Sequence, residues 1–353
     1  MTGVISRAEQ KCFVHRLEGP VGGSGVSDIG VLTVELFDAD GASGFGFSYV
    51  LGGGAGTDLA AKALDLQLQR FILGKQLPHP RVLWERITKS FNRTGLGPNL
   101  LGLAAIDVAA WDLHARRLGL PLGAAMGGKL RPVQVYGSGR FNAQQSASET
   151  VDIAREHLQR GLTAIKPRVS GDPRDAARVA AVRAAVGDAA HIMLDANEKP
   201  DLPAAVWLMN VARDNGALFV EEPLPSDFWS GYRTLRRSSG PAIAWGEHGQ
   251  ALGQFAMFAS DGLAAVLQPD LAMIGGLTPI LNVCSLAETT NAIVSPHFLP
   301  GLFVHVGAVS RALRWLEDFP LLEGLFEGWP DISADGTVMP RSVAGHGLRL
   351  LRT

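Results

Sequence analysis

The sequence predicts an α/β protein in which a parallel β/α barrel follows an N-terminal α+β region. After Pro132, eight short apolar runs alternate with stretches of helical periodicity, the pattern of a parallel sheet whose strands are joined by helices. Before Pro132, strand-like runs come first and helix-like sequence follows, without that alternation. Eight such units favour a barrel over an open doubly wound sheet, because the first unit lacks the Gly-x-Gly-x-x-Gly signature of that alternative.

Length and composition exclude several classes of function. The chain has 353 residues, 46 % of them hydrophobic, which is enough for one large barrel or two domains. The net charge is −2 and no Lys/Arg run occurs, so we expect neither nucleic acid nor a membrane as partner. Cys12 and Cys284 match no metal or redox spacing. Because we find no signal peptide and no apolar run of about 18 residues, we expect a cytoplasmic protein.

The first 60 or so residues predict antiparallel strands followed by helices. The segment Asp38–Gly41 is a turn signal between two strand-like runs and predicts a hairpin. The preceding segment, Gly19–Asp28, is rich in Gly and Ser and predicts a mobile loop. From Thr57 the pattern becomes helical, and Gly119 followed by Pro121 marks the end of the last helix.

The eight apolar runs after Pro132 each carry a polar or titratable group among their last residues. Their last residues are Ser138, Arg168, Asn197, Pro223, His248, Asp270, His297 and Asp318. In a parallel barrel the carboxyl ends of all strands face one way, and that face carries the active site. The polar ends therefore predict one site.

Three successive runs carry the carboxylates Asp195, Glu221 and Glu247 near their ends, at equal intervals of one β/α unit. A single acid in such a place is more often a helix cap or a loop ion pair. The regular order on successive strands favours a metal site instead, because three unpaired carboxylates would raise one another's pKa. Three hard oxygen ligands suit Mg²⁺ better than zinc or copper.

The remaining runs supply an acid–base pair and two cations. Asp270 lies one strand before His297, and a carboxylate in that position can orient an imidazole and stabilise its charged form. A lone histidine is more often structural, so it is the ordered series of groups that argues for catalysis. Glu317 stands on the eighth run, and Lys166 and Arg168 end the second.

These motifs resemble the enolase superfamily, and within it the mandelate racemase subgroup (the mandelate racemase/muconate lactonizing enzyme family). The segments that carry the resemblance are AAIDVAAWDLHARRLGLPLGAAMGG, AIKPR, LDAN, FVEEPL, WGEHG, QPDLAMIGGLT and SPHF, and together they span most of the chain. The resemblance implies a modified TIM barrel, (β/α)7β, in residues 126–324. It also implies an α+β capping domain of residues 1–125, completed by residues 325–353, and a homo-oligomer.

The resemblance further implies roles for individual residues. The implied Mg²⁺ ligands are Asp195, Glu221 and Glu247; the implied acid–base dyad is Asp270 and His297, with Glu317 as hydrogen-bond donor to the substrate carboxylate. The implied contacts of a small carboxylate substrate are Arg168, His248, Glu317 and Asn197. The segment Gly19–Asp28 is expected to close over the substrate.

One position departs from the subgroup. The second strand there often reads Lys-x-Lys with the second lysine as base, whereas this chain reads Lys166-Pro167-Arg168. A guanidinium keeps its proton at ordinary pH, so we expect Arg168 to position the substrate and supply positive charge. Lys166 is expected to stabilise the negative charge that develops beside the substrate carboxylate.

The resulting expectation is Mg²⁺-dependent removal of the proton α to a carboxylate. Because Arg168 is a poor base, we favour dehydration of a sugar acid, an aldonate or aldarate, to a 2-keto-3-deoxy acid. Gly246-Glu247-His248 also resembles the acid-sugar dehydratase form of the fifth strand. Two alternatives stay open: a racemase or epimerase of a 2-hydroxy acid, and a non-catalytic sugar-acid binding protein.

Overall fold

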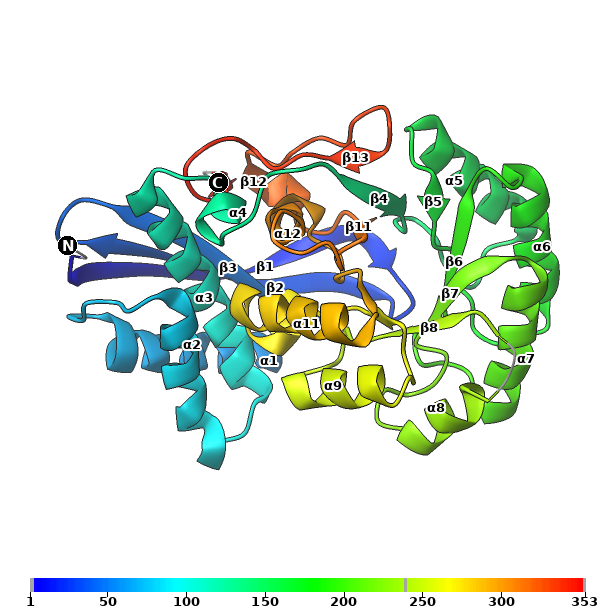
Figure 1. The fold of residues 1–353 in the computed structure, drawn as a ribbon, viewed down its shortest axis with the longest axis horizontal. Coiled ribbons are helices and arrows are strands. Elements are labelled where there is room, and N and C mark those ends of the chain that lie inside the picture. Colours follow the sequence, from blue (N-terminus) through cyan, green and yellow to red (C-terminus); the bar gives the residue numbers. More distant parts are fainter. Residues whose placement is uncertain (1–2, 238–239, 352–353) are drawn as a thin grey trace.

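An antiparallel sheet from the N-terminal region lies beside a barrel of parallel strands in the computed structural model, which describes residues 3–237 and 240–351 (Figure 1). The antiparallel sheet has the order β1 (Ile5–Val21), β2 (Val26–Asp38) and β3 (Ser43–Leu51). Asp38 forms the predicted turn between β2 and β3, because its Oδ1 accepts the N–H groups of Asp40 and Ala42 at 3.0 and 2.8 Å. The predicted hairpin is confirmed.

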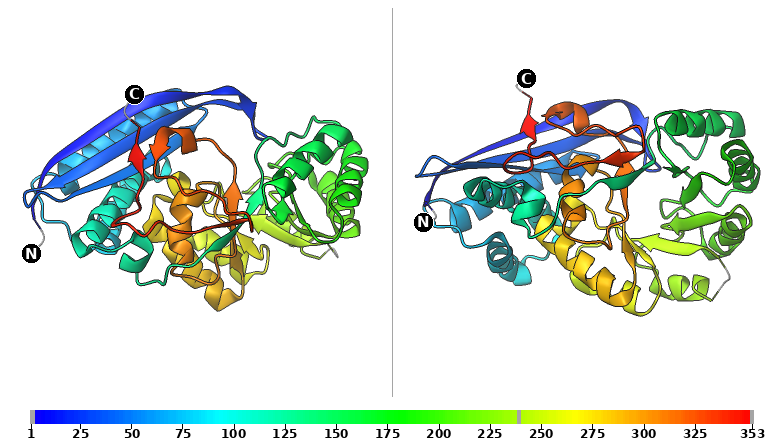
Figure 2. Two further views of the ribbon diagram at one scale, coloured as in Figure 1. Left: turned by 90° about the horizontal axis from the view of Figure 1, so that it is seen from above. Right: turned by 45° about the horizontal axis from the view of Figure 1, so that its top comes forward.

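The glycine-rich segment Gly19–Asp28 is mostly strand, so the expectation of a loop was wrong. β1 and β2 stay paired until Val21 faces Val26, and only residues 22–25 form a turn. Gly and Ser lower strand propensity, but pairing across a hairpin satisfies backbone hydrogen bonds whatever the side chains are. The tip of this hairpin extends from the antiparallel sheet toward the barrel (Figure 2).

Helices cover one face of the antiparallel sheet. They are α1 (Ala55–Gln67), the π-helical turn η1 (Leu68–Ile72), α2 (Pro80–Thr88), the 3-10 turn η2 (Lys89–Arg93), α3 (Gly97–Leu118) and the short α4 (Leu122–Ala125). α3 approaches the sheet so closely that a Cβ at Gly46 would lie 2.2 Å from the Ala105 carbonyl oxygen. α3 ends where the sequence predicts, at Gly119, whose φ of 65° is the left-handed conformation that glycine adopts readily.

All eight predicted barrel strands are present. They are β4 (Val133–Gly137), β5 (Ala164–Ile165), β6 (His191–Asp195), β7 (Ala217–Glu221), β8 (Ala242–Trp245), β9 (Val266–Leu267), β10 (Ile293–Val294) and β11 (Trp315–Asp318). They pair in parallel in the order β10-β9-β8-β7-β6-β5-β4-β11. A bridge between Val294 and Leu313 brings the two ends together, so the barrel is nearly closed.

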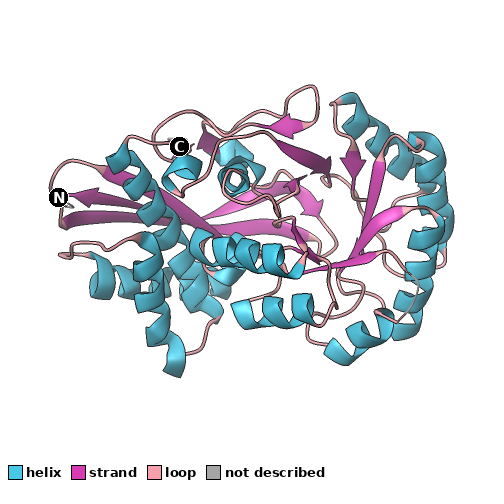
Figure 3. Ribbon diagram, viewed as in Figure 1, coloured by secondary structure: helices cyan, strands magenta, loops and turns pink. Residues whose placement is uncertain are grey.

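Helices surround the barrel on its outer side (Figure 3). They are α5 (Ala147–Gln159), α6 (Arg174–Val186), α7 (Leu202–Asp214), α8 (Trp229–Leu235), α9 (Leu252–Ser260), α10 (Leu271–Ile274), α11 (Leu277–Thr290) and α12 (Pro300–Gly307). Inside the barrel, buried side chains from successive strands pack together, among them Tyr136, Met193 and Phe219. The interior is therefore a filled core, and the site lies at its rim.

The C-terminal segment returns to the antiparallel sheet. After η3 (Glu323–Leu325), β12 (Phe326–Glu327) pairs with β14 (Arg349–Leu350), and β13 (Thr337–Val338) pairs with β4. The ring of Phe326 lies 4.6 Å from that of Phe47 on β3, measured between centroids. The exact division into residues 1–125 with 325–353 and residues 126–324 stays a prediction. Among the described residues, no helix is long and apolar enough to cross a membrane.

Candidate active site

Lys166, which follows β5, lies among three of the carboxylates that the sequence assigns to the site. Its Nζ is 2.5 Å from Glu221 Oε2, 2.7 Å from Glu317 Oε1 and 3.5 Å from Asp195 Oδ2. Burial lowers the pKa of this fully buried ammonium, but the charges of Glu221 and Glu317 outweigh it and hold the pKa well above its usual value. Lys166 is thus a fixed positive charge in this structure.

Arg168 lies next to Lys166 and is held from two sides. Its Nη1 pairs with Asp195 Oδ2 and donates to Asn197 Oδ1 at 2.7 Å. Its Cζ lies 5.2 Å from the ring centroid of Phe319. The buried Nε has no hydrogen-bond partner among the described residues. An N–H group in that state is ready for an acceptor on a ligand.

Asp270 and His297 form the predicted pair. His297 Nδ1 lies 2.8 Å from Asp270 Oδ2, and Asp270 Oδ1 accepts the N–H groups of Ala272 and Met273, each at 2.9 Å. Asp270 is therefore also the N-cap of α10, which fixes its carboxylate. The same Oδ2 accepts a hydrogen bond from the Tyr49 hydroxyl on β3 at 2.5 Å.

The second nitrogen of His297 faces Glu247. Nε2 lies 3.6 Å from Glu247 Oε2. Burial lowers the pKa of His297, but the charge of Glu247 and the hydrogen bond to Asp270 raise it more strongly, to about 10. The imidazole therefore holds a proton at neutral pH, and it accepts one only when the neighbouring negative charge is offset.

Glu317 is ionised in this structure. Burial raises the pKa of its carboxyl, but the ammonium of Lys166 lowers it more, to about 2. Its Oε2 accepts the N–H of Phe298 at 3.0 Å. The expected role as hydrogen-bond donor to a substrate would require Glu317 to take up a proton first.

Asp195, Glu221 and Glu247 are the carboxylates that the sequence predicts as metal ligands. Glu221 is buried; its Oε2 accepts from Lys166 and from Gln268 Nε2 at 2.7 Å, while its Oε1 has no partner among the described residues. Burial raises the pKa of Glu221, and repulsion from Asp195 and Glu247 adds to it, so that the pKa lies well above its usual range. A positive ion at the free oxygen would relieve both costs.

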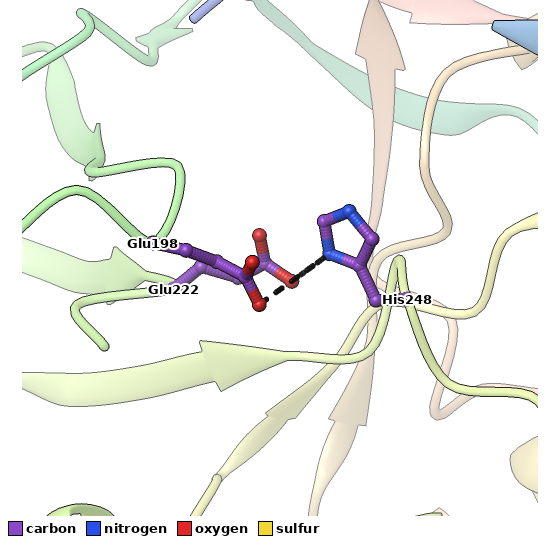
Figure 4. A group of neighbouring side chains, drawn as sticks. All are labelled: Glu198, Glu222 and His248. Carbon is purple, nitrogen blue, oxygen red and sulfur yellow. Dashed lines mark hydrogen bonds and ion pairs between the residues drawn. The ribbon is translucent and has the colours of Figure 1, made fainter. Parts of the chain in front are cut away.

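A second group of possible metal ligands comes from residues next to each other in space, and Figure 4 shows their side chains pointing toward one another. Glu198, Glu222 and His248 each offer one ligand atom, and these atoms all lie within 4.8 Å of one another. His248 Nδ1 is 2.8 Å from Glu222 Oε1 and 3.7 Å from Glu198 Oε1. Burial and the charge of Glu247 raise the pKa of Glu222 to about 8, although its bond to His248 opposes this. The cluster is a candidate magnesium site.

Two family models match this chain. The model described as mandelate racemase/muconate lactonizing enzyme, N-terminal domain, matches residues 21–127, and the model described as enolase C-terminal domain-like matches residues 149–353. The chain belongs to the mandelate racemase/muconate lactonizing enzyme family. The resemblance to this family and the nearly closed parallel barrel with an antiparallel capping sheet, both expected from the sequence, are confirmed.

Relatives within this family include enzymes that act on sugar acids. The chain is 29 % identical to 3,6-anhydro-alpha-L-galactonate cycloisomerase of Streptomyces coelicolor, over 92 % of this chain and 90 % of the relative. It is 30 % identical to L-talarate/galactarate dehydratase of Salmonella typhimurium, over 85 % and 76 % respectively. L-talarate dehydratase from Polaromonas sp. JS666, solved with Mg and L-glucarate, superimposes with a TM-score of 0.91 at 29 % identity, covering 99 % of this chain and 96 % of that one.

Some residues of the candidate magnesium cluster and of the proposed dyad's surroundings were not expected from the sequence. Glu198 and Glu222 were not assigned as ligands, and His248 was expected to contact only substrate. A usable signal existed, since Glu222 and His248 directly follow the assigned ligands Glu221 and Glu247. Tyr49 gave no such signal, because it comes from the capping sheet and meets Asp270 only in the folded chain.

Proposed function

We propose that this protein removes the α-proton of a sugar acid in the presence of Mg²⁺ and then expels the β-hydroxyl, giving a 2-keto-3-deoxy acid. The observation that carries the proposal is the asymmetry of the site: one imidazole with an orienting carboxylate, His297 with Asp270, shares a cavity with the buried cation Arg168. L-talarate/galactarate dehydratase, one of the relatives, supports the same reaction class.

We assign the metal to Asp195, Glu221 and Glu247. All three offer oxygen, which Mg²⁺ prefers, whereas the cluster of Glu198, Glu222 and His248 includes a nitrogen ligand. The unpartnered Oε1 of Glu221 supports this assignment. Mg²⁺, when bound, supplies fixed positive charge that lowers the energy of the carbanion formed beside the substrate carboxylate.

In the proposed reaction, His297 accepts the proton from C2 through Nε2, and Asp270 stabilises the imidazolium through Nδ1. The electron pair of the broken C–H bond forms the C2–C3 double bond as the C3–O bond breaks. The departing hydroxyl leaves as water after taking a proton, which His297 is placed to return. The enol product then tautomerises to the 2-keto acid.

In this proposal Lys166 and Arg168 stabilise the negative charge that develops on the substrate, and neither accepts the α-proton. Lys166 and Arg168 lie against Asp195, and the free Nε–H of Arg168 is available to a substrate oxygen. A racemase or epimerase would need a second base on the opposite face of the α-carbon. A guanidinium is a poor base, and for this reason the racemase alternative is less favoured.

Exchange of the α-proton in D₂O tests the proposal. With Mg²⁺ in D₂O, the purified protein should incorporate deuterium at C2 of a sugar-acid substrate from one face. It should also release a 2-keto-3-deoxy product. His297→Asn should abolish both, while Arg168→Lys should retain them and add exchange from the opposite face. Interconversion of both α-epimers without keto product would establish the racemase instead. Tight binding of sugar acids without any exchange would leave only the non-catalytic binding protein.

A further inference from the structure

Two cavities meet at the proposed dyad, and His297 lines both of them. The first, which we call the hairpin cavity, has a volume of about 40 Å³, lies under the β1–β2 turn, and has walls that include Gly22, Gly23, Arg168, Asn197 and Phe319. The second, which we call the dyad cavity, has a volume of about 240 Å³, and its walls include Tyr49, Leu51, Leu101, His248, Asp270 and Met273. Leu51, Glu247 and His297 line both.

The two volumes indicate which cavity accommodates the carbon chain of a substrate. The hairpin cavity, at about 40 Å³, is much smaller than the dyad cavity, at about 240 Å³, so it suits one small polar group rather than a carbon chain. That cavity contains Arg168 and Asn197, which suit a carboxylate or hydroxyl. The carbon chain beyond the reacting centre must then extend past His297 into the dyad cavity.

The outer wall of the dyad cavity is apolar. Val50 and Leu51 come from β3, Leu101 comes from α3, and Ala272 and Met273 come from α10. Leu51 is 39 % exposed, so its side chain is available for contact with a ligand. Burying a methyl or methylene group against such a wall is favourable, whereas burying an unpaired charge there is costly.

No lysine or arginine lines the dyad cavity in the part of the chain that the structure describes. Its acidic groups are Glu247 and Asp270. Among the described lining residues, His248 is the one basic side chain besides His297, and its ring nitrogens already lie 2.8, 3.7 and 3.9 Å from the carboxylates of Glu222, Glu198 and Glu247. A second carboxylate at the far end of a substrate would find no free positive charge.

We infer that the substrate is a monocarboxylic sugar acid whose far end is uncharged, a methyl or hydroxymethyl group, and that aldarates are rejected. The inference rests on the proposed function and narrows it. The chain then departs from L-talarate/galactarate dehydratase, whose named substrates are diacids. Discrimination arises because the terminal group contacts Leu51, Leu101 and Met273 in place of a cation.

Binding of matched acids tests this directly. Within each of several configuration series, three acids share C2 to C5 and end in methyl, hydroxymethyl or carboxylate. Their affinities are measured by calorimetry on Mg²⁺-loaded His297→Asn protein, so that turnover is not required. In the series that binds best, we expect the diacid to bind at least about 100-fold more weakly, since its second charge goes unpaired. Equal or tighter binding of a diacid would overturn the inference.

A substitution in the wall gives an independent measurement. Leu101→Arg should reduce the ratio of monoacid affinity to diacid affinity by about 10-fold or more, because it adds the missing cation. Leu118→Arg is the matched control on the same helix, since Leu118 is exposed and lines neither cavity. Met273→Lys serves the same purpose from α10 if Leu101→Arg does not fold. If Leu101→Arg or Met273→Lys folds and the ratio of the two affinities does not change, the inference is contradicted.

The same assays separate the two proposals. Selective binding of monoacids without α-proton exchange by the unmodified protein would refute the dehydratase function and leave the ligand class in place. Turnover of an aldarate as the best substrate would refute the ligand class and leave the reaction in place. Failure of every acid to bind would overturn both.

Discussion

The hydroxyl of Tyr49 donates to the Asp270 oxygen that also faces His297, at 2.5 Å, although Tyr49 stands in the antiparallel sheet and Asp270 in the barrel. Both oxygens of the Asp270 carboxylate therefore have partners. Oδ1 accepts two backbone N–H groups, and Oδ2 contacts Tyr49 and His297. The capping sheet thus helps to set the orientation of the proposed catalytic pair.

Tyr49→Phe should therefore lower kcat by about 10-fold with little change in KM, because the Asp270 carboxylate loses one of the bonds that orient it. The free energy of unfolding should fall by about 1.5–3 kcal/mol, as expected for a hydrogen bond to a charged group. Kinetics and thermal unfolding measure both. Tyr232→Phe, which removes a bond to the Leu224 carbonyl, is the control and should affect stability alone. A kcat equal to that of the control would refute the positioning role.

Glu221→Gln and Glu222→Gln should have unequal effects on Mg²⁺ affinity. If Asp195, Glu221 and Glu247 hold the metal, Glu221→Gln should weaken binding by about 100-fold or more and Glu222→Gln by about 10-fold or less. Titration calorimetry with Mg²⁺ alone measures both, independently of turnover. The reverse order would place the metal at Glu198, Glu222 and His248.

Mg²⁺ affinity should rise with pH. The pKa of His297 is about 10, because the charge of Glu247 and the bond to Asp270 overcome the effect of burial. A cation at Glu247 offsets that charge and lowers the pKa, so binding releases a proton. Affinity should therefore increase as pH rises from about 7 toward the metal-free pKa and level off above it.

Imidazole resonances followed by NMR, with and without Mg²⁺, measure the shift of His297 directly. His248 also has a pKa of about 10, raised chiefly by its hydrogen bond to Glu222. The variants His297→Asn and His248→Gln separate the two contributions to the pH dependence. A His297 pKa that does not move when Mg²⁺ binds would contradict the assignment of Glu247 as a ligand.

Gly23→Ala should displace the tip of the β1–β2 hairpin from the site. A Cβ at Gly23 would lie 1.7 Å from Asn197 Oδ1, so the turn or the side chain has to move. We expect KM to increase by about 10-fold, since Arg168 loses its hydrogen bond to Asn197, one of the contacts that hold it. Gly19→Ala is the control, because a Cβ there meets no atom within 4 Å.

A double-variant cycle identifies the cause. In an Asn197→Gly background the clash is removed, and Gly23→Ala should then have little further effect. An equal effect of Gly23→Ala in both backgrounds would show that the hairpin does not act through Asn197.

Much of the barrel was predictable from local pattern. Each strand is a short apolar run, and side chains such as Asp195 and Glu221 follow from where the run stops. The parallel barrel then places all these ends on one face, so the sequence order alone assembles Lys166, Glu247 and His297 near one another. The hairpin at Gly19–Asp28 was mistaken for a loop because composition reports propensity and says little about pairing between strands.

The set of groups on the barrel rim therefore follows from local sequence, because apolar periodicity fixes the strands and the strands fix the direction of their ends. Which of these groups touch depends on tertiary packing. Tyr49 and Asp270 are 221 positions apart, and their contact depends on how the antiparallel sheet packs on the barrel. The pairing of Glu222 with His248 and the apolar wall of the dyad cavity depend likewise on side-chain packing between elements, which no local pattern specifies.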